Sequence, residues 1–400
     1  MKVVIIGNGL AGTMAAKTLR ELDPQVEVQV FAEEKYPYYP RPNLIEFVAG
    51  KLPFEKVFAF SGDWHVRQKI DIQLGNPVRR IDPDSKEVEV GEGGRVGYDA
   101  LLIASGASSF IPPIKGAAKR GVFTLRTIED AMAMLDYLKG HRRVVVIGGG
   151  LLGLEIARAI RSREADVEVV EVFDRLLPRQ LDTQGAALLK NQIESLGIRV
   201  RLGVTTDEIL GADEVRGLRL KSGTGLDADM AVIAAGVRPN LALPAGAGLK
   251  TDKGLIVDDR LQTSAAGIFA AGDGVQHRGR IYGIIPASFE QARAAAFNIL
   301  GQEKIYEGTV WANTLKVVGV YVTSVGLAIP EGEGYKEIRK SSPEEGIYKK
   351  VVLQDDALVG AIWMGTKKGA SEITRAVTLR QKVGQRADSL LDDAFDFSQL

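Results

Sequence analysis

The chain of 400 residues contains no cysteine and only three histidines. Without thiols it cannot form a disulfide, ligate an iron–sulfur cluster or perform dithiol or sulfenic acid chemistry. The histidines, His65, His141 and His277, do not show the spacing of metal ligands, so we expect structural or surface roles for them. The sequence therefore predicts no metal site and no redox reaction through cysteine.

Long hydrophobic runs and an excess of one charge are also missing. Basic and acidic residues both number 51, so the formal net charge is +0 and gives no indication of a nucleic-acid-binding surface. No apolar run approaches the roughly 18 residues of a membrane span. Glycines interrupt the apolar start of the chain, which argues against a secretory signal, and the expected location is the cytoplasm.

Glycine is abundant, with 45 residues, and organises the chain. An apolar run at residues 1–6 leads into a glycine loop at 7–12 and then into a helical pattern. A strand that turns sharply into a helix leaves backbone N–H groups unpaired, and the pyrophosphate of a dinucleotide can bind there. The same pattern returns at residues 143–155, which predicts two dinucleotide sites and electron transfer from one dinucleotide to the other. The loop glycines are Gly7, Gly9 and Gly12, and then Gly148, Gly150 and Gly153.

An acidic residue follows the next strand in each of these two units. The strand expected at residues 26–31 leads to Glu33, which we expect to hold a ribose diol, with Glu34 as the alternative register. The strand expected at 167–170 ends at Glu171, roughly 20 residues past the second loop. Glu171 would accept a hydrogen bond from a ribose 2′-OH and repel a 2′-phosphate, which favours NADH, although Arg175 and Arg179 keep NADPH open.

Further segments have weaker signals. Residues 36–43 hold three prolines, three tyrosines and one arginine, which suits either ligand recognition or a packed surface loop. The acidic tail at 388–400 is either a docking segment or a cap on its domain.

The other expected strands are 87–90, 98–104, 227–235, 254–258, 267–274, 314–325, 347–353 and 357–364, and the other expected helices are 127–137, 286–300 and 371–380.

Five motifs in order, at residues 7–12, 103–107, 148–155, 234–239 and 269–273, resemble those of the pyridine nucleotide–disulfide reductase superfamily of flavoproteins. The resemblance implies an α/β fold with two Rossmann-like three-layer dinucleotide-binding domains, the second inserted in the first, and a C-terminal α+β domain. The implied domains are an FAD-binding domain at 1–114 and 239–308, an NAD(P)H-binding domain at 115–238 and a C-terminal interface domain at 309–400.

Residues 38–42, 284–291 and 314–319 are similar to the FAD modules of NADH:rubredoxin oxidoreductases and of nitrite reductase large subunits. Disulfide reductases and peroxidases of the superfamily carry redox cysteines after the segment that ends at Pro42, and this chain has none there. Related ferredoxin reductases often have lysine at the position that aligns with Glu46, so this chain must differ near the flavin.

The resemblance implies that FAD and NAD(H) are the cofactors, with NADP(H) less favoured. Hydride would move between NADH and FAD, and single electrons between FAD and an iron or iron–sulfur partner: rubredoxin, ferredoxin or a subunit of a larger complex, with flux in either direction. An oligomer or complex is expected, without nucleic acid and without a membrane span. The alternatives are NADH oxidation by O2 and a non-catalytic nucleotide-sensing or assembly role.

The resemblance also implies the functional residues. Glu155, one turn into the second helix, would lie by the nicotinamide, and the helix that begins near Ala287 would direct its N–H groups at the flavin. Besides the loop glycines, cofactor contacts are expected at Leu10, Ala11, Glu33, Glu34, Arg41, Pro42, Val78, Ala104, Ser105, Gly106, Leu151, Leu152, Glu171, Gly236, Gly272, Asp273, Pro286 and Ala287.

Overall fold

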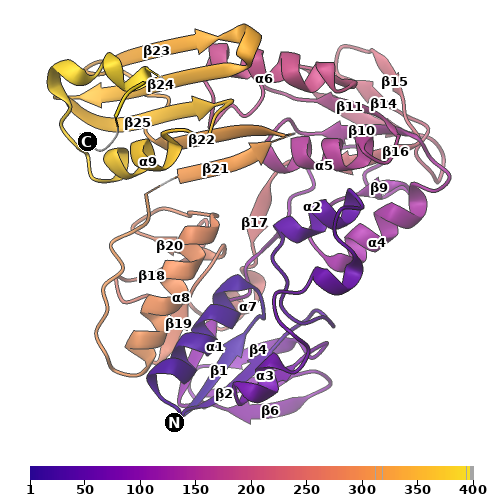
Figure 1. Cartoon of the computed structure of the whole chain (residues 1–400). Coiled ribbons are helices and arrows are strands. Elements are labelled where there is room, and N and C mark those ends of the chain that lie inside the picture. The colour runs from indigo at the N-terminus through magenta and orange to yellow at the C-terminus, as the bar shows by residue number, and fades with distance from the viewer. Residues whose placement is uncertain (311, 318, 393, 397–400) are drawn as a thin grey trace. The chain divides into compact units, whose positions relative to one another are not determined.

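The computed structural model describes residues 1–310, 312–317, 319–392 and 394–396 (Figure 1). The chain forms two compact units, each built from segments that are separate in sequence. The division into three domains that the sequence predicts stays a prediction. Unit 1 comprises Met1–Asn43, Leu52–Ser108 and Val237–Thr309, and unit 2 comprises Leu44–Lys51, Ser109–Gly236 and Val310–Leu400.

Unit 1 is built on a five-stranded parallel sheet with β1 (Lys2–Ile6) at its centre. Residues 3–6 of β1 are all buried, as expected for a strand covered on both faces. Ile6 pairs with Phe31 on one side and with Ile103 on the other, so these three parallel strands end at the same edge of the sheet. From the central strand, the next strand of the chain lies on one side and a later strand lies on the other. At such a reversal of strand order, α/β sheets form the crevice in which they bind ligands. The order is β19 (Ile268–Ala270), β7 (Ala100–Ile103), β1, β2 (Glu27–Phe31) and β3 (Ile70–Gln73).

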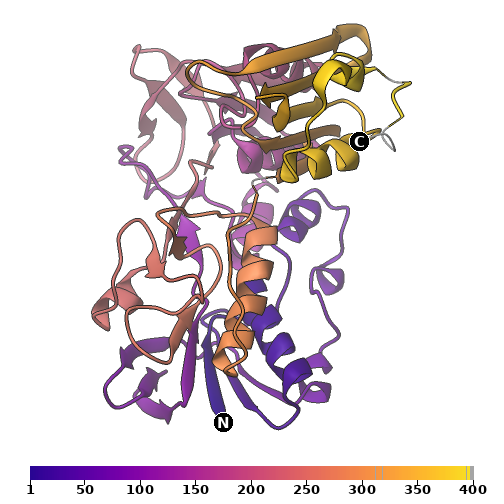
Figure 2. The same cartoon turned by 90° about the vertical axis from the view of Figure 1, so that its left-hand side faces the viewer.

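Helices α1 (Leu10–Leu22) and α8 (Ile285–Ile299) pack side by side in unit 1 (Figure 2). Both helices present small residues to each other and to the sheet, including the fully buried Ala15 and Ala295. The smaller elements of this unit are α3 (Trp64–Arg67), β4 (Val78–Asp82), β5 (Glu87–Val90), β6 (Gly94–Gly97), β17 (Val237–Pro239), α7 (Ala242–Gly246), β18 (Leu255–Val257) and β20 (Val275–His277). The residues of two further elements, α2 (Pro42–Val48) and β8 (Ala107–Ser109), are divided between the two units.

Unit 2 repeats the parallel arrangement around β10 (Arg143–Ile147). Ile147 pairs with Val170 and with Ile233, so Gly148, Glu171 and Ala234 follow at one edge of this sheet. The order is β12 (Ile198–Arg201), β11 (Asp166–Val170), β10, β16 (Met230–Ile233) and β9 (Val122–Phe123). The accompanying elements are α4 (Ile128–Tyr137), α5 (Leu151–Arg161), α6 (Thr183–Ser195) and the antiparallel strands β13 (Thr206–Leu210), β14 (Gly217–Leu220) and β15 (Gly225–Asp227).

The strand expected at 227–235 forms as β16, but it begins only at Met230. The expected start at Asp227 was wrong, because Asp227 ends β15, which belongs to a different sheet. Asp229 separates them, and its carboxylate accepts hydrogen bonds from the Arg143 backbone N–H at 3.2 Å and from the Arg143 side chain. This ion pair ties the break to the start of β10, a contact that hydrophobic periodicity does not reveal.

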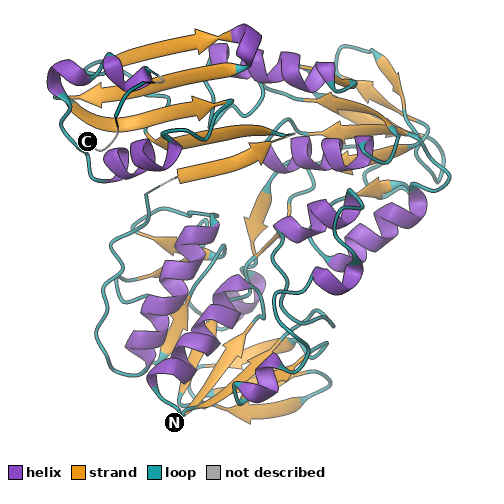
Figure 3. Ribbon diagram, in the orientation of Figure 1, coloured by secondary structure: helices purple, strands orange, loops and turns teal. Residues whose placement is uncertain are grey.

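The C-terminal part of unit 2 is a five-stranded antiparallel sheet with α9 (Ala370–Thr378) packed against β22 and β25 (Figure 3). The single strand expected at 314–325 is instead a hairpin of β21 and β22, with Gly319 at a φ of 93° between them. The order is β21 (Ala312–Val317), β22 (Val320–Gly326), β25 (Ala357–Met364), β24 (Ile347–Gln354) and β23 (Lys336–Ser342).

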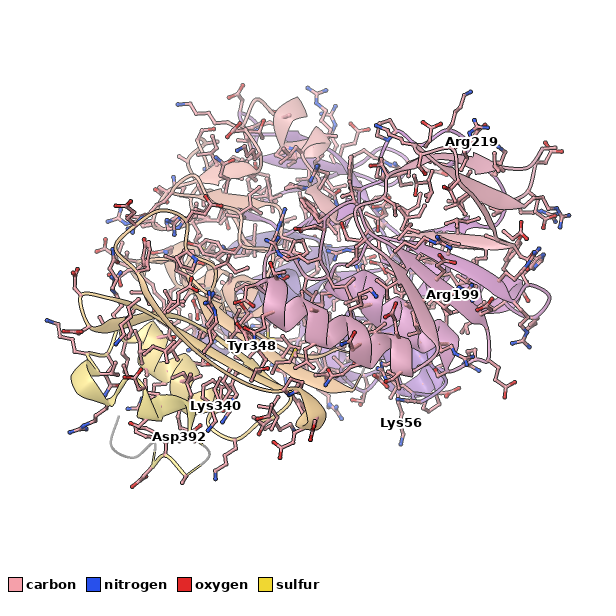
Figure 4. All side chains as sticks on the ribbon, turned by 90° about the horizontal axis from the view of Figure 1, so that it is seen from above. Lys56, Arg199, Arg219, Lys340, Tyr348 and Asp392 are labelled. Atoms are coloured by element: carbon pink, nitrogen blue, oxygen red, sulfur yellow. The ribbon has the colours of Figure 1, made fainter. Side chains whose placement is uncertain are left out.

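The start of the acidic tail packs on this sheet. Leu390 and Leu391 are buried, and Lys340 pairs with Asp392 at 2.9 Å (Figure 4). These contacts favour the interpretation that residues 388–392 cap their domain. Residues 393 and 397–400 of the tail lie outside the described residues, as does residue 318 of the motif at 314–319. Among the described helices, none combines the length and the apolar character needed to cross a membrane.

Candidate dinucleotide-binding sites

The first glycine loop has strict steric limits at two of its three glycines. A Cβ on Gly7 would lie 2.3 Å from the Ala104 carbonyl oxygen, and a Cβ on Gly12 would lie 1.9 Å from the Gly7 oxygen. A Cβ on Gly9, in contrast, would meet no atom within 4 Å. The outer glycines allow strand, loop and helix to close on one another, and the middle glycine leaves open space where a pyrophosphate can approach the backbone.

The start of α1 is suited to an anion. Gly9 is the N-cap residue, no side chain caps the helix, and its first turn, which includes Leu10 and Ala11, holds no acidic residue. The first N–H groups of a helix lack intrahelical acceptors, and they carry the positive end of the helix dipole. Asn8 adds a buried Nδ2 that has no partner among the described residues. These donors fit the phosphate oxygens of a dinucleotide.

The two acidic residues after β2 have different surroundings. Glu34 accepts hydrogen bonds from Arg41, at 2.5 Å, and from the Tyr39 hydroxyl, whereas Glu33 is exposed and has no partner in the part of the chain that the structure describes. Burial alone would lower the pKa of Arg41, but the bond to Glu34 raises it above its usual value. Glu33 is therefore the carboxylate that is available to a ribose diol.

The tyrosines in the segment at 36–43 pack against other residues of the chain, which favours the interpretation as a packed loop. Tyr39 is buried, and the Tyr36 ring packs against Phe54 and Phe58 with ring centroids 6.1 and 6.3 Å apart. Pro42 is exposed at the start of α2, and Val78 is half-buried at the start of β4. Neither of these two side chains shows a ligand-directed feature of its own.

Ser105 and Gly106 follow β7 at the opposite side of the first loop. They line a small hollow together with Asn240, Ala271 and other residues of unit 1. Asn240 Nδ2 donates to the Ser105 carbonyl oxygen at 2.8 Å, and Gly106 has a φ of 66° with open space where a Cβ would point. Because Ala104 is buried against Gly7, this short stretch of small residues leaves the backbone accessible to a cofactor.

Gly272 and Asp273, which follow β19, are held by residues that the sequence analysis missed. The Gly272 N–H donates to Gln291 Oε1 at 2.9 Å, and the Ser288 hydroxyl donates to Asp273 Oδ1 at 3.3 Å. Gln291 and Ser288 are buried on α8. A polar pair on the inner face of a helix one turn apart is the signal that could have identified them.

Helix α8 also begins without a side-chain cap. Ile284 is the N-cap residue, Pro286 lies in the first turn, and Ala287 is buried. Proline at the start of a helix removes an N–H that would have no intrahelical acceptor in any case. The remaining N–H groups of the first turn are directed out of the helix, as the interaction with a flavin requires.

The second glycine loop reproduces the geometry of the first. A Cβ on Gly148 would lie 2.4 Å from the Ala234 oxygen, and a Cβ on Gly153 would lie 2.0 Å from the Gly148 oxygen. Gly150 again has open space, and it is the N-cap of α5, whose first turn holds no acidic residue and no capping side chain. Leu151 and Leu152 follow it, half-buried and exposed respectively.

Glu171 is held close to this loop. Its buried carboxylate accepts hydrogen bonds from the Gly149 N–H at 2.5 Å and from the Phe173 N–H at 2.9 Å. One carboxylate has about four lone-pair directions, so it can still accept from a ribose hydroxyl. Gly236, which follows β16, is exposed with a φ of 98°.

The two arginines near Glu171 differ in availability. The Arg175 guanidinium bonds to the Leu181 and Pro178 carbonyl oxygens at 3.3 and 3.5 Å and to Asp174 at 2.9 Å. Arg179 is exposed. The hydrogen bonds of Arg175 are therefore largely made within its own loop. Binding of a 2′-phosphate would require attraction by Arg179 to outweigh repulsion by the Glu171 carboxylate.

Glu155 takes part in a charged group on the surface of α5. The Arg158 guanidinium lies 3.1 Å from the Glu155 carboxylate and 2.9 Å from the Glu46 carboxylate. Sequence reasoning expected a role for Glu155 and noted Glu46, but it did not connect them, because Glu46 and Arg158 are 112 residues apart.

The open middle glycines, the uncapped helices and the acidic residues fit one dinucleotide at each loop. A bound flavin accepts the hydride of NADH as an electron pair and can release electrons singly. The backbone N–H groups at the two helix starts would hold the phosphates of these cofactors, and the carboxylates would hold the riboses.

This fold, with two such loops, defines an oxidoreductase of the two-dinucleotide flavoprotein class. The family described as pyridine nucleotide-disulphide oxidoreductase matches residues 1–296, and the chain belongs to this family. The rubredoxin NAD+ reductase C-terminal domain matches residues 312–381. The predicted superfamily and fold class are thereby confirmed, as are FAD and NAD(H) as the cofactors.

Several relatives are similar over most of this chain. Nitrite reductase of Bacillus subtilis is 37% identical over 383 residues, 95% of this chain and 47% of that protein. NADH-rubredoxin oxidoreductase of Clostridium acetobutylicum is 29% identical over 370 residues, 92% of this chain and 93% of that protein. The ferredoxin reductase for the CYP199A2 system of Rhodopseudomonas palustris has a TM-score of 0.91 at 26% identity, and the match covers 100% of this chain and 99% of that one. The chain spans about half the length of the nitrite and nitrate reductase proteins it matches.

Proposed function

We propose that this chain is an FAD-dependent NADH:acceptor oxidoreductase. A hydride moves between NADH and FAD, and single electrons move between FAD and an iron or iron–sulfur protein. The observation that carries the proposal is the pair of glycine loops, each with an open middle glycine and an uncapped helix. One chain with two such sites has a direct use for both only if electrons pass between the two dinucleotides.

In this proposal, FAD binds in unit 1. Its pyrophosphate lies on the start of α1, its ribose diol on Glu33, and its remaining contacts involve residues 104–106, Asp273 and the start of α8. NADH binds in unit 2, with its pyrophosphate on the start of α5, its ribose on Glu171 and its nicotinamide beside Glu155. Glu171, held by two backbone N–H groups, supports NADH over NADPH because a 2′-phosphate would meet a fixed negative charge.

An acceptor with its own metal centre fits the composition of the chain. These 400 residues contain no cysteine, so the thiolates of an iron or iron–sulfur centre must come from elsewhere, either a partner protein or another part of a larger complex. The names of the relatives support this reading, since they include an NADH-rubredoxin oxidoreductase and a ferredoxin–NAD+ reductase subunit. We also propose a cytoplasmic location, where NAD(H) is available, and assembly into an oligomer or complex.

A second candidate function is NADH oxidation by O2. The NADH oxidase of Methanocaldococcus jannaschii, 34% identical over 82% of this chain and 76% of that protein, favours it. Against it, the chain has no cysteine at which a peroxide could be reduced.

Acceptor kinetics test the proposal. The flavoprotein is reduced anaerobically with one equivalent of NADH and mixed in a stopped-flow instrument with rubredoxin, with a [2Fe–2S] ferredoxin or with O2. Reoxidation by at least one iron protein should be at least about tenfold faster than by O2, a difference of about 1.4 kcal/mol in the barrier. Faster reoxidation by O2 would support the oxidase, and a flavin that NADH reduces only slowly would support a nucleotide-sensing role.

A further inference from the structure

A chain of hydrogen bonds in unit 1 runs from the turn after β19 to the surface of α8. The Gly272 N–H donates to Gln291 Oε1 at 2.9 Å, and Gln291 Nε2 donates to the Tyr306 hydroxyl oxygen at 3.4 Å. The hydroxyl oxygens of Tyr306 and Thr309 lie 2.8 Å apart, and the Thr309 hydroxyl donates to Glu290 Oε2 at 2.5 Å. All five residues belong to unit 1, although they come from three separate segments of the sequence.

The carboxylate at one end sets the direction of every bond in this hydrogen-bond chain. An ionised Glu290 only accepts, so Thr309 donates its proton there, and the Thr309 oxygen must accept from Tyr306. Because the Tyr306 proton is directed at Thr309, the Tyr306 oxygen accepts from Gln291 Nε2. The other side of the amide, Oε1, then faces the Gly272 N–H, which can only donate. Both ends of the chain therefore select the same orientation of the Gln291 amide.

The amide is fixed in this orientation by its surroundings. Gln291 and Tyr306 are only 1% and 4% exposed, so water cannot replace a lost bond. A turned amide would set Nε2 against the Gly272 N–H, and two buried donors that face each other are costly. Tyr306 is itself held in place, since its backbone N–H donates to the Asp259 carbonyl oxygen at 2.8 Å. Burial raises the pKa of Tyr306 to about 12, so its hydroxyl keeps the proton that it donates.

The turn at the other end of the chain packs against the start of α1. Gly272 has a φ of 101°, and a Cβ there would lie 3.0 Å from the Ala11 Cβ and 4.0 Å from Ser288 Oγ. Ala11 belongs to the first turn of α1, which no side chain caps and where the FAD pyrophosphate is proposed to bind. A shift of the Gly272 peptide would therefore change the space that is left for the pyrophosphate.

We propose that Tyr306 is a positioning residue for FAD: it fixes the Gln291 amide, and Gln291 thereby holds the turn at Gly272 in the conformation that receives the pyrophosphate. Thr309 and Glu290 complete the arrangement, because they direct the Tyr306 proton away from Gln291. Tyr306 lies 15 residues beyond Gln291 and outside all the motifs of the sequence, so no local pattern indicates this role. The inference rests on the proposed function, since it places FAD at the start of α1.

FAD retention tests the idea. The holoprotein is diluted, and the FAD released at equilibrium is measured by its fluorescence, which gives a Kd. Q291M, which removes the acceptor of the Gly272 N–H, should raise the Kd about tenfold, and Y306F, which leaves the amide able to turn, about threefold. In the double variant the Kd should match that of Q291M within about twofold, because Tyr306 acts only through Gln291.

Phosphorus NMR of the bound FAD separates positioning from a general loss of stability. The resonances of the pyrophosphate should move in Y306F and in Q291M relative to the wild type, because the turn beside the phosphates has shifted. Tyr282 offers a matched control: it is a buried tyrosine whose ring centroid lies 5.9 Å from that of Tyr306, but its hydroxyl is not part of the hydrogen-bond chain. Y282F should leave the Kd within about twofold and the resonances unchanged.

The outcomes distinguish this inference from the proposed function. If Y306F matches the wild type, if it raises the Kd without moving the resonances, or if Y282F has the same effects, the inference is wrong and the proposed function stands. The comparison of Y306F with Y282F decides the question even if Q291M does not fold. If the wild-type protein binds no FAD, the proposed function fails and the inference fails with it.

Discussion

In the first glycine loop region, Glu33 is exposed and unpaired within the described part of the chain, whereas in the second the buried Glu171 accepts N–H groups from Gly149 and Phe173. The loops themselves have the same steric pattern. The second site thus holds its acidic residue in place before any ligand binds, as suits a nucleotide that must bind and leave in every turnover. The first site leaves its acid in solvent, where a resident cofactor would cover it.

The comparison of outer and middle glycines gives the largest expected effects. Gly12→Ala and Gly153→Ala place a Cβ about 2 Å from a carbonyl oxygen. Each should therefore lower the free energy of unfolding by at least about 3 kcal/mol or prevent folding of its unit. Gly9→Ala and Gly150→Ala, with open space, should retain the fold but weaken the dinucleotide at the same loop about tenfold or more. Thermal unfolding measures the stability of all four variants, flavin content measures the loss at the first loop, and calorimetric titration with NADH measures the loss at the second. A Gly12→Ala protein as stable as Gly9→Ala would contradict the steric account.

The difference between the two acids predicts a second effect. Glu171→Ala should weaken NADH binding about tenfold and also lower stability, because the Gly149 and Phe173 N–H groups lose their acceptor. Glu33→Ala should weaken FAD retention without lowering the stability of the flavin-free protein, since its carboxylate is exposed. Calorimetric titrations and urea unfolding of the two variants provide the comparison, and equal losses of stability would contradict it.

In unit 2, a tyrosine of the C-terminal sheet is hydrogen-bonded to the start of a helix. The Tyr348 hydroxyl on β24 donates to Asp182 at 2.6 Å, and Asp182 is the N-cap of α6 (Figure 4). Tyr348→Phe removes this bond and leaves a buried acceptor less well satisfied, so it should cost about 1–2 kcal/mol. NADH affinity should change only slightly, and FAD content should stay constant. A loss of flavin in this variant would contradict this local, structural role of Tyr348.

The smallest expected effect is a dependence on pH. Burial would raise the pKa of Asp182, but hydrogen bonds from Tyr348 and Gly185 and the charge of Lys350 lower it below its usual value. A depressed pKa contributes stability above the unfolded value of about 3.9, and this contribution is lost as the pH falls through the folded value. Asp182→Asn, which keeps an N-cap residue, should be less stable than the wild type by about 1 kcal/mol at pH 7. The difference in urea midpoint should shrink as the pH falls below about 4, and a constant difference would exclude Asp182 as the titrating group.

Sequence patterns predicted the features that depend on local geometry. The spacing of the glycines follows from how closely strand, loop and helix approach, and Thr127 forms the capping box of α4 at the expected start of that helix. Long apolar runs in the sequence correctly predicted the buried strands β1, β10 and β25. Contacts between distant segments could not be predicted, because no local signal marks them. The Glu46–Arg158 pair and the break at Asp229 are of this kind.

The central claim is that the two loops form two cooperating dinucleotide sites, and an anaerobic titration of the purified protein tests it most directly. NADH and NADPH are added separately while the yellow absorbance of the flavin is recorded for the wild type and for Glu171→Ala. The account predicts rapid, stoichiometric bleaching of the wild type by NADH, a much weaker response to NADPH, and a Glu171→Ala protein that keeps its flavin but requires about tenfold more NADH. A colourless protein, or a bound flavin that neither nucleotide reduces, would contradict the account.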